Sequence, residues 1–117
     1  TKFVVLQEAG SPFIWMQAIE EKELAFVTIE PATFMMEYKL VISPNDYEVV
    51  GVKDSETLKV LFIVTIPEKL SDMTANLQGP VILNLKKRVG KQSISITDKY
   101  KVRHRILDEI QTKSGDE

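Results

Sequence analysis

The strongest constraint on this chain is a series of short runs of β-branched and aromatic residues, separated by turn residues, that recurs from one end to the other. Such runs are typical of β-strands, because branched and aromatic side chains pack well on a pleated surface. They predict strands over seven segments, namely residues 3–6, 13–19, 24–29, 38–42, 58–66, 81–85 and 91–97. The short connections between several of them favour antiparallel pairing of neighbours.

Two of these segments are apolar on both faces. Residues 58–66 are nearly all apolar, which is typical of a strand covered on both sides and predicts the centre of the core. Residues 13–19 also place apolar side chains on both faces, so this strand is expected beside the central one. Phe13 and Trp15 are therefore predicted to be core residues with no direct part in binding.

Residues 91–97 follow a different pattern. Ile94 and Ile96 share one face of an extended segment, while Ser93, Ser95 and Thr97 share the other. A period of two is typical of an antiparallel strand with one buried face and one face in water. We therefore predict a half-buried strand here.

Helix signals are few. Ser43 can cap a helix that has Pro44 in its first turn and Asp46 near its positive end, and Gly51 would stop it after about two turns. Weaker signals predict a single turn at residues 71–74 and a short tail helix over residues 106–111. The fold class is thus all-β or β-rich: a small antiparallel β-barrel-like domain or folded sandwich over residues 1–112, with one or two short helices and a disordered tail over residues 113–117.

Composition narrows the function classes. The 117 residues include no cysteine, which excludes disulfides, thiolate zinc sites and cysteine nucleophiles and fits a reducing compartment such as the cytoplasm. The longest apolar run, residues 60–64, is far shorter than the ~20 residues of a membrane span. The single histidine, His104, lies between two arginines that would oppose a bound cation. We expect no enzyme, no cofactor and no metal.

Glycines and carboxylates add no catalytic motif. The five glycines are far apart and form no phosphate-binding loop. The carboxylates of predicted loops and of the short helix are expected to be solvated charge; these are Glu20, Glu21, Glu23, Asp46, Glu48, Asp54 and Glu56.

Charge is distributed unevenly along the chain. Residues 1–80 hold six lysines against twelve carboxylates, whereas residues 81–117 hold nine basic side chains against five acidic ones. This pattern indicates either two oppositely charged faces for different partners or charges that mix on the folded surface. The basic segment 86–105 also leaves open a small nucleic-acid-binding β-barrel, although Tyr100 is its only aromatic residue.

The segment that leaves the central strand at Val64 and re-enters a strand after Pro80 is long enough to form a packed surface loop, and such loops often bind partners. Met73, Ala75 and Leu77 would form an apolar contact patch if they face outward, or anchor the loop if they turn into the core. Asn76 could contact a partner or support the loop backbone.

Several motifs of this chain resemble the bacterial flagellar assembly factor FliW family. They are residues 12–17 (PFIWMQ), 24–26 (LAF), 64–67 (VTIP), 73–80 (MTANLQGP) and 90–92 (GKQ), together with Asn84, Tyr100, Arg103 and His104. They follow the order and spacing of the family from about Phe3 to Arg105. Family members usually begin with an additional stretch containing strand material ahead of the position of Phe3, and this chain opens without it.

The resemblance implies a monomeric β-barrel-like protein without catalytic activity that binds flagellin and also binds the translational repressor CsrA, whose silencing of flagellin messenger RNA it prevents. It implies no direct contact with nucleic acid or membrane. We expect partner contacts at the long loop and, for the basic repressor, at an acidic turn. The candidate residues are Glu68, Asp72, Met73, Thr74 and Asn76 in the loop, and Glu20, Glu21 and Glu23 in the turn.

Overall fold

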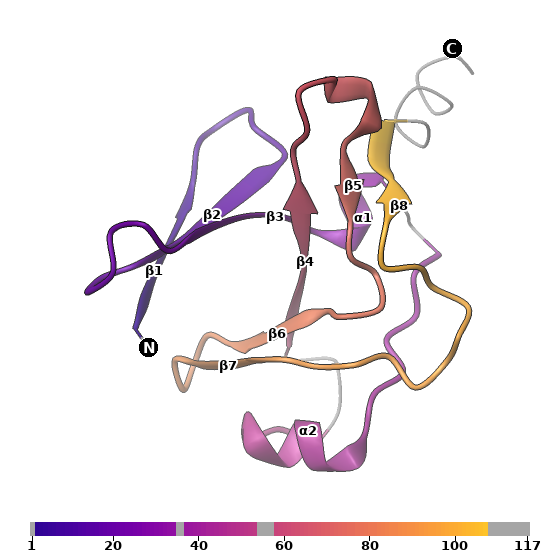
Figure 1. Cartoon of the computed structure of the whole chain (residues 1–117). Helices are drawn as coiled ribbons and strands as arrows, with labels where there is room; N and C mark the ends of the chain where they lie inside the picture. Colours follow the sequence, from indigo (N-terminus) through magenta and orange to yellow (C-terminus); the bar gives the residue numbers. More distant parts are fainter. Residues whose placement is uncertain (1, 35–36, 54–57, 108–117) are drawn as a thin grey trace.

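The computed structural model describes residues 2–34, 37–53 and 58–107. Within these ranges the chain forms eight strands of one curled antiparallel sheet, an open half-barrel, with two short α-helices (Figure 1). This confirms the predicted β-rich class. No helix in the described ranges is both long enough and apolar enough to cross a membrane.

The strands are β1 (Phe3–Gln7), β2 (Phe13–Ala18), β3 (Ala25–Ile29), β4 (Lys59–Thr65), β5 (Thr74–Ala75), β6 (Val81–Asn84), β7 (Val89–Gln92) and β8 (His104–Arg105). Short turns join β1 to β2, β2 to β3 and β6 to β7, while a longer connection that contains both α-helices joins β3 to β4. The main path runs β1-β2-β3-β4-β5-β8, and β6 pairs with both β4 and β7. Strand β4 therefore joins the two parts of the sheet. Strand β3 lies between β2 and β4, so the expectation that residues 13–19 lie beside the central strand is wrong.

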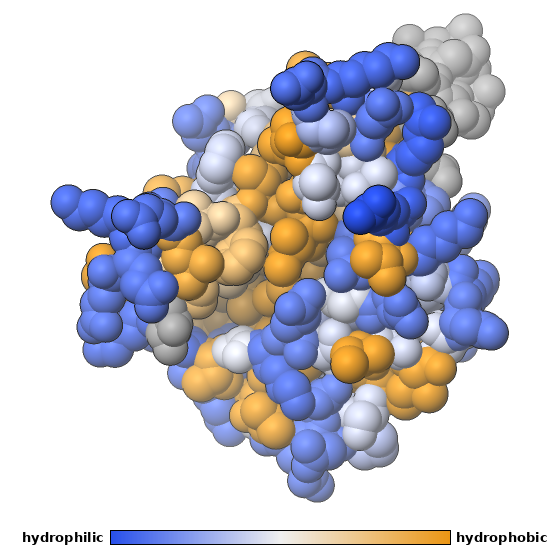
Figure 2. All heavy atoms as spheres, viewed as in Figure 1, coloured by the Kyte–Doolittle hydropathy of each residue, from blue (hydrophilic) through white to orange (hydrophobic). Residues whose placement is uncertain are grey.

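Alternation along β4 divides the core into two layers. Phe62 and Val64 enter the main core, which also contains Phe34 from helix α1 (Pro31–Phe34). Leu61 and Ile63 point to the opposite face, where they join a second cluster with residues of β2 and β6. Figure 2 shows apolar side chains gathered in a hollow over β4, beside the β1–β3 strands. The residues that define this cluster are at most 8% exposed, and the partly buried Phe3, Phe26 and Ile63 pack against them.

Helix α2 (Pro44–Val49) forms where its signals predict. The Ser43 hydroxyl accepts a hydrogen bond from the Asn45 backbone N–H, Pro44 opens the helix, and the chain leaves it through Gly51 at a φ of 77°. Asp46 is not solvated charge, which corrects that expectation. Its carboxylate is buried, 2.5 Å from the Lys91 ammonium and hydrogen-bonded by the Ser93 hydroxyl, and it ties the helix to the segment after β7.

Two predicted strands differ from the structure. Residues 38–42 form no strand; Tyr38 packs its ring 4.8 Å from that of Phe62 and 4.6 Å from that of Tyr100. The strand predicted over 91–97 begins earlier and ends at Gln92. At residues 71–74 the predicted turn is a short 3-10 helix, Leu70–Asp72. The predictions for residues 108–111 and for the tail lie outside the described residues.

Trp15 is not a core residue, which is a further correction. It is 45% exposed, and its cross-strand neighbours are Leu6 in β1 and Val27 in β3. Phe13, on the same face, is half-buried against the main core. Gln17 interrupts this face, and of its residues Phe13 is the one that packs against the main core. Two-sided apolar sequence therefore identifies a strand here without fixing its burial.

Candidate partner-binding surface

The long loop after β4 is anchored by its apolar residues. Met73 is 6% exposed, and Ala75 and Leu77 are almost fully buried, all three in the main core. The expectation that they form an outward contact patch is wrong. The alternative, that they anchor the loop, is the one that the structure supports, because β5 pairs with β4 and brings their side chains onto its main-core face.

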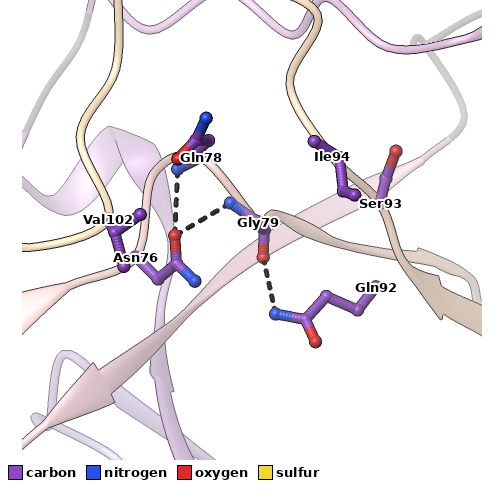
Figure 3. Close-up of a pocket in the computed structure, with 7 residues that line it drawn as sticks. All are labelled: Asn76, Gln78, Gly79, Gln92, Ser93, Ile94 and Val102. Atoms are coloured by element: carbon purple, nitrogen blue, oxygen red, sulfur yellow. Dashed lines mark hydrogen bonds between the residues drawn. The ribbon is translucent and has the colours of Figure 1, made fainter. Parts of the chain in front are cut away.

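Asn76 supports the turn that follows the anchors. Its side-chain oxygen accepts hydrogen bonds from the backbone N–H groups of Gln78, at 3.1 Å, and Gly79, at 2.9 Å (Figure 3). A side chain added at Gly79 would place its Cβ 3.0 Å from the side-chain amide nitrogens of Asn76 and Gln92. The family motif therefore encodes a tight turn, in which this glycine lets the amides approach closely.

A shallow hollow opens beside this turn, with a volume of about 490 Å³. The residues that line it include Gln92, whose side-chain amide donates to the Gly79 carbonyl at 3.1 Å. Ile94 and Val102 flank the hollow from two separate segments (Figure 3). Neither side chain is buried: Ile94 is 71% exposed and Val102 is 52% exposed.

The outward position of Ile94 has a clear backbone cause. The Ser93 N–H donates to the Pro80 carbonyl at 2.8 Å and the Ser95 N–H donates to the Gln78 carbonyl at 2.7 Å, so the segment remains extended beyond β7. Both serine side chains are buried, and that of Ser93 reaches Asp46. The isoleucines must then face water, and Ile96 is 64% exposed. We call Ile94, Ile96 and Val102 the isoleucine rim.

Basic side chains stand next to the isoleucine rim. Lys99, Lys101 and Arg103 are exposed on the segment that leads into β8, with Asp98 as their acidic neighbour. The backbone of this segment is fixed because the Leu77 N–H donates to the Lys101 carbonyl at 3.0 Å. Exposed apolar and basic side chains therefore lie on one segment, which this hydrogen bond joins to the buried Leu77.

The acidic candidates lie in two other places. Glu20, Glu21 and Glu23 are exposed in the turn between β2 and β3. Glu68 and Asp72 are exposed between β4 and β5, where Asp72 lies 3.5 Å from the Arg105 guanidinium. Thr74, which is half-buried, pairs with Arg105 in the sheet. The structure thus presents the acidic candidates on separate elements.

The basic segment is poorly arranged to bind bases. Tyr100 is buried, with its hydroxyl accepting from the Lys39 N–H at 2.9 Å, so its ring is not free to stack on a nucleobase. Lys91 is engaged with Asp46. These contacts remove two of the groups on which the nucleic-acid hypothesis depends.

Titratable groups of the described ranges form no cluster of three metal-ligating side chains. Hydrogen bonds from Lys91 and Ser93 lower the pKa of Asp46, against the opposing effect of its burial. Burial raises the pKa of Tyr38, whose hydroxyl has no hydrogen-bond partner among the described residues. The His104 ring packs 5.8 Å from the Phe34 ring, which places it at the edge of the main core.

The fold defines a small protein built on one curled, antiparallel β-sheet, with exposed apolar side chains at the 94–102 segment and elsewhere. Comparison with known proteins shows the family to which the chain belongs. The family model described as FliW protein matches residues 1–106, so the chain belongs to the FliW family.

Individual relatives agree with this assignment. The flagellar assembly factor FliW of Alkaliphilus metalliredigens is 42% identical over 113 residues, which cover 95% of this chain and 70% of the relative. That of Leptospira biflexa is 39% identical over 114 residues, covering 97% and 74%. A crystal structure of the flagellar assembly factor FliW matches with a TM-score of 0.81 and 36% identity, over 89% of this chain and 73% of that one.

Proposed function

We propose that this chain is a non-catalytic cytoplasmic regulator of flagellar assembly, which binds flagellin and antagonises the translational repressor CsrA, and thereby controls flagellin synthesis. Its relatives are flagellar assembly factors. The observation that carries the proposal is the isoleucine rim, where the fold exposes large apolar side chains beside the family's motif turn. Exposed apolar groups on a rigid base are typical of protein-binding surfaces.

The two partners suit different parts of the surface. A helical segment of flagellin would bury apolar side chains against Ile94, Ile96 and Val102. CsrA binds RNA and is therefore expected to present basic groups, which favours contact with the acidic candidates, Glu20, Glu21 and Glu23 in the turn and Glu68 and Asp72 in the loop. Thr74 borders this loop, while Met73 and Asn76 act by holding it in place.

The direct test is titration of the purified chain with flagellin, with CsrA and with flagellin messenger RNA alone. The proposal predicts saturable binding to each protein and none to the RNA at physiological salt. Saturable binding to the RNA alone, without binding to either protein, would contradict it and favour the nucleic-acid alternative.

The acidic turn has its own test. Replacing Glu20, Glu21 and Glu23 by Gln should slow association with CsrA and reduce its salt dependence, because exposed charges act mainly on the encounter rate. The matched control replaces Glu48, which is exposed on α2. Equal association rates at low salt for the parent and the triple variant would move the acidic docking face elsewhere.

A further inference from the structure

Two side-chain amides hold the same residue in the turn at residues 76–79. The Asn76 side-chain oxygen accepts from the Gly79 N–H at 2.9 Å, and the Gln92 side-chain nitrogen donates to the Gly79 carbonyl at 3.1 Å (Figure 3). These partners fix both orientations, because a backbone N–H can only donate and a backbone carbonyl can only accept. The Asn76 nitrogen and the Gln92 oxygen must therefore face other directions.

The fold leaves one polar atom of each amide unused. The Asn76 Nδ2 and Gln92 Oε1 atoms take part in no hydrogen bond among the described residues. Gln92 is exposed, and the Asn76 nitrogen is not sealed from solvent. Both residues line the hollow beside the turn. The hollow therefore presents an N–H donor from one amide and an acceptor from the other.

The two amides are close together and held in place. A Cβ atom added at Gly79 would lie 3.0 Å from both side-chain nitrogens, so the glycine lets the amides approach one point. Each amide is bonded to the backbone, so little side-chain freedom remains to be lost on binding. Ile94 and Val102 stand on two sides of the hollow, where they can exclude water from a polar contact (Figure 3).

An extended polypeptide backbone offers the matching pair of groups. Each of its peptide units carries an acceptor and a donor, whereas those inside a helix are already bonded to one another. We propose that the hollow binds an extended segment of flagellin by its backbone, with Asn76 Nδ2 donating to a carbonyl and Gln92 Oε1 accepting from an N–H. This inference rests on the proposed function, because the segment would continue from the helical part bound on the isoleucine rim.

A nucleobase suits this pair of amides less well. Asparagine or glutamine recognises adenine with the oxygen and the nitrogen of one amide together. Here one atom of each amide is already bonded to Gly79, so neither amide can clamp a base alone. Recognition through the backbone does not depend on the side chains of the bound segment, so the rim would supply the specificity for flagellin.

Asn76→Asp tests the donor alone. The carboxylate keeps an oxygen for the Gln78 and Gly79 N–H groups, so the turn should persist, but the N–H donor is lost. We expect titration calorimetry with flagellin to show affinity about tenfold weaker at an unchanged melting temperature. Gln78→Glu is the matched control, because it adds the same charge in the same hollow at a side chain that the proposal does not use. It should retain the affinity of the parent.

Two variants of Gln92 test the acceptor. Gln92→Glu and Gln92→Met both lose the hydrogen bond to Gly79, but only the glutamate keeps an oxygen for the partner. Gln92→Met should therefore bind flagellin several-fold more weakly than Gln92→Glu. Equal affinities of these two variants would overturn the acceptor contact.

The same titrations separate failure of this inference from failure of the proposed function. Equal flagellin affinity of the parent and Asn76→Asp would overturn the inference, and so would equal losses in Asn76→Asp and Gln78→Glu, which would assign the effect to charge. If Ile94→Asp weakens binding and Asn76→Asp does not, the rim remains the binding surface and the hollow does not. A parent chain that does not bind flagellin would overturn the proposed function and this inference with it.

Discussion

Strand β2 carries apolar side chains on both faces, whereas the segment after β7 alternates isoleucine with serine, and the two bury different kinds of side chain. In β2 the side chains of Ile14 and Met16 face inward and are buried, whereas that of Trp15 faces the other way and is half-exposed. After β7 the serines face inward and Ile94 and Ile96 face water. The comparison shows that alternation indicates an extended chain, while the neighbours of the backbone decide which face is buried.

The polar partners explain the difference. Turning the isoleucines inward would direct the Ser93 hydroxyl away from the Asp46 carboxylate, which is buried and needs its hydrogen bonds. At β2, the hydroxyl of Thr28, in the neighbouring strand β3, donates to the Ile14 carbonyl at 2.7 Å. The buried Asp46 carboxylate thus explains the orientation of the residues after β7, and Thr28 shows that a buried polar side chain at β2 is also hydrogen-bonded.

The largest effect should come from the shared core strand. Phe62→Ala removes a fully buried ring at the junction of the sheet and should reduce the free energy of unfolding by about 3–5 kcal/mol. Urea denaturation measures this. A loss below about 1 kcal/mol would show that β4 is not the centre of the core.

The buried serines provide the next test. Ser93→Ala removes a hydrogen bond to a buried carboxylate and should cost about 1–3 kcal/mol of unfolding free energy. Ser95→Ala is the matched control, because the Ser95 hydroxyl is buried without a hydrogen-bond partner among the described residues, and it should be nearly neutral. Equal losses would remove the polar explanation for the exposed isoleucines.

The pH dependence of stability should report on the same carboxylate. The pKa of Asp46 is lowered in the folded chain, so its contribution is present above the unfolded carboxyl pKa of about 3.9 and is lost as the pH falls through the folded value. In the Asp46→Asn variant, the free energy of unfolding should therefore decrease less steeply as the pH is lowered. Parallel stability curves for parent and variant would contradict this assignment.

Trp15→Ala should have a small effect on folding, in contrast to Phe62→Ala. Its exposed ring makes cross-strand contacts worth about 0.2–1 kcal/mol. The thermal midpoint and urea curve measure the change. A loss of several kcal/mol would mean that this face of β2 is covered in solution.

Much of the fold could be predicted from the sequence where a local signal suffices. The apolar run of β4 and the cap, proline and glycine of α2 identify both elements. The two-residue strands β5 and β8 could not be predicted, because they depend on pairing between distant segments. The strand expected at 38–42 is absent because a strand needs a pairing partner, which a local sequence pattern does not reveal, and no strand of the described ranges pairs with this segment.

The candidate surface was only partly predictable. The length of the loop after β4 indicates a surface loop. Sequence alone could not decide whether Met73 faces inward, because an apolar side chain can either anchor a loop in the core or contact a partner. Ile94 was visible within an alternating pattern, and only the buried contacts of Ser93 show that it faces outward. Exposure, unlike extended structure, is a property of the assembled sheet.

Calorimetric titration of flagellin and CsrA into the chain and two variants tests the central claim most directly. Ile94→Asp changes the isoleucine rim, and Leu85→Asp changes an equally apolar, exposed residue at the turn after β6. We predict that Ile94→Asp weakens binding of at least one partner by about tenfold or more, while Leu85→Asp changes neither and both variants melt like the parent. Unchanged affinity of Ile94→Asp for both partners would contradict the assignment of the rim as a binding surface.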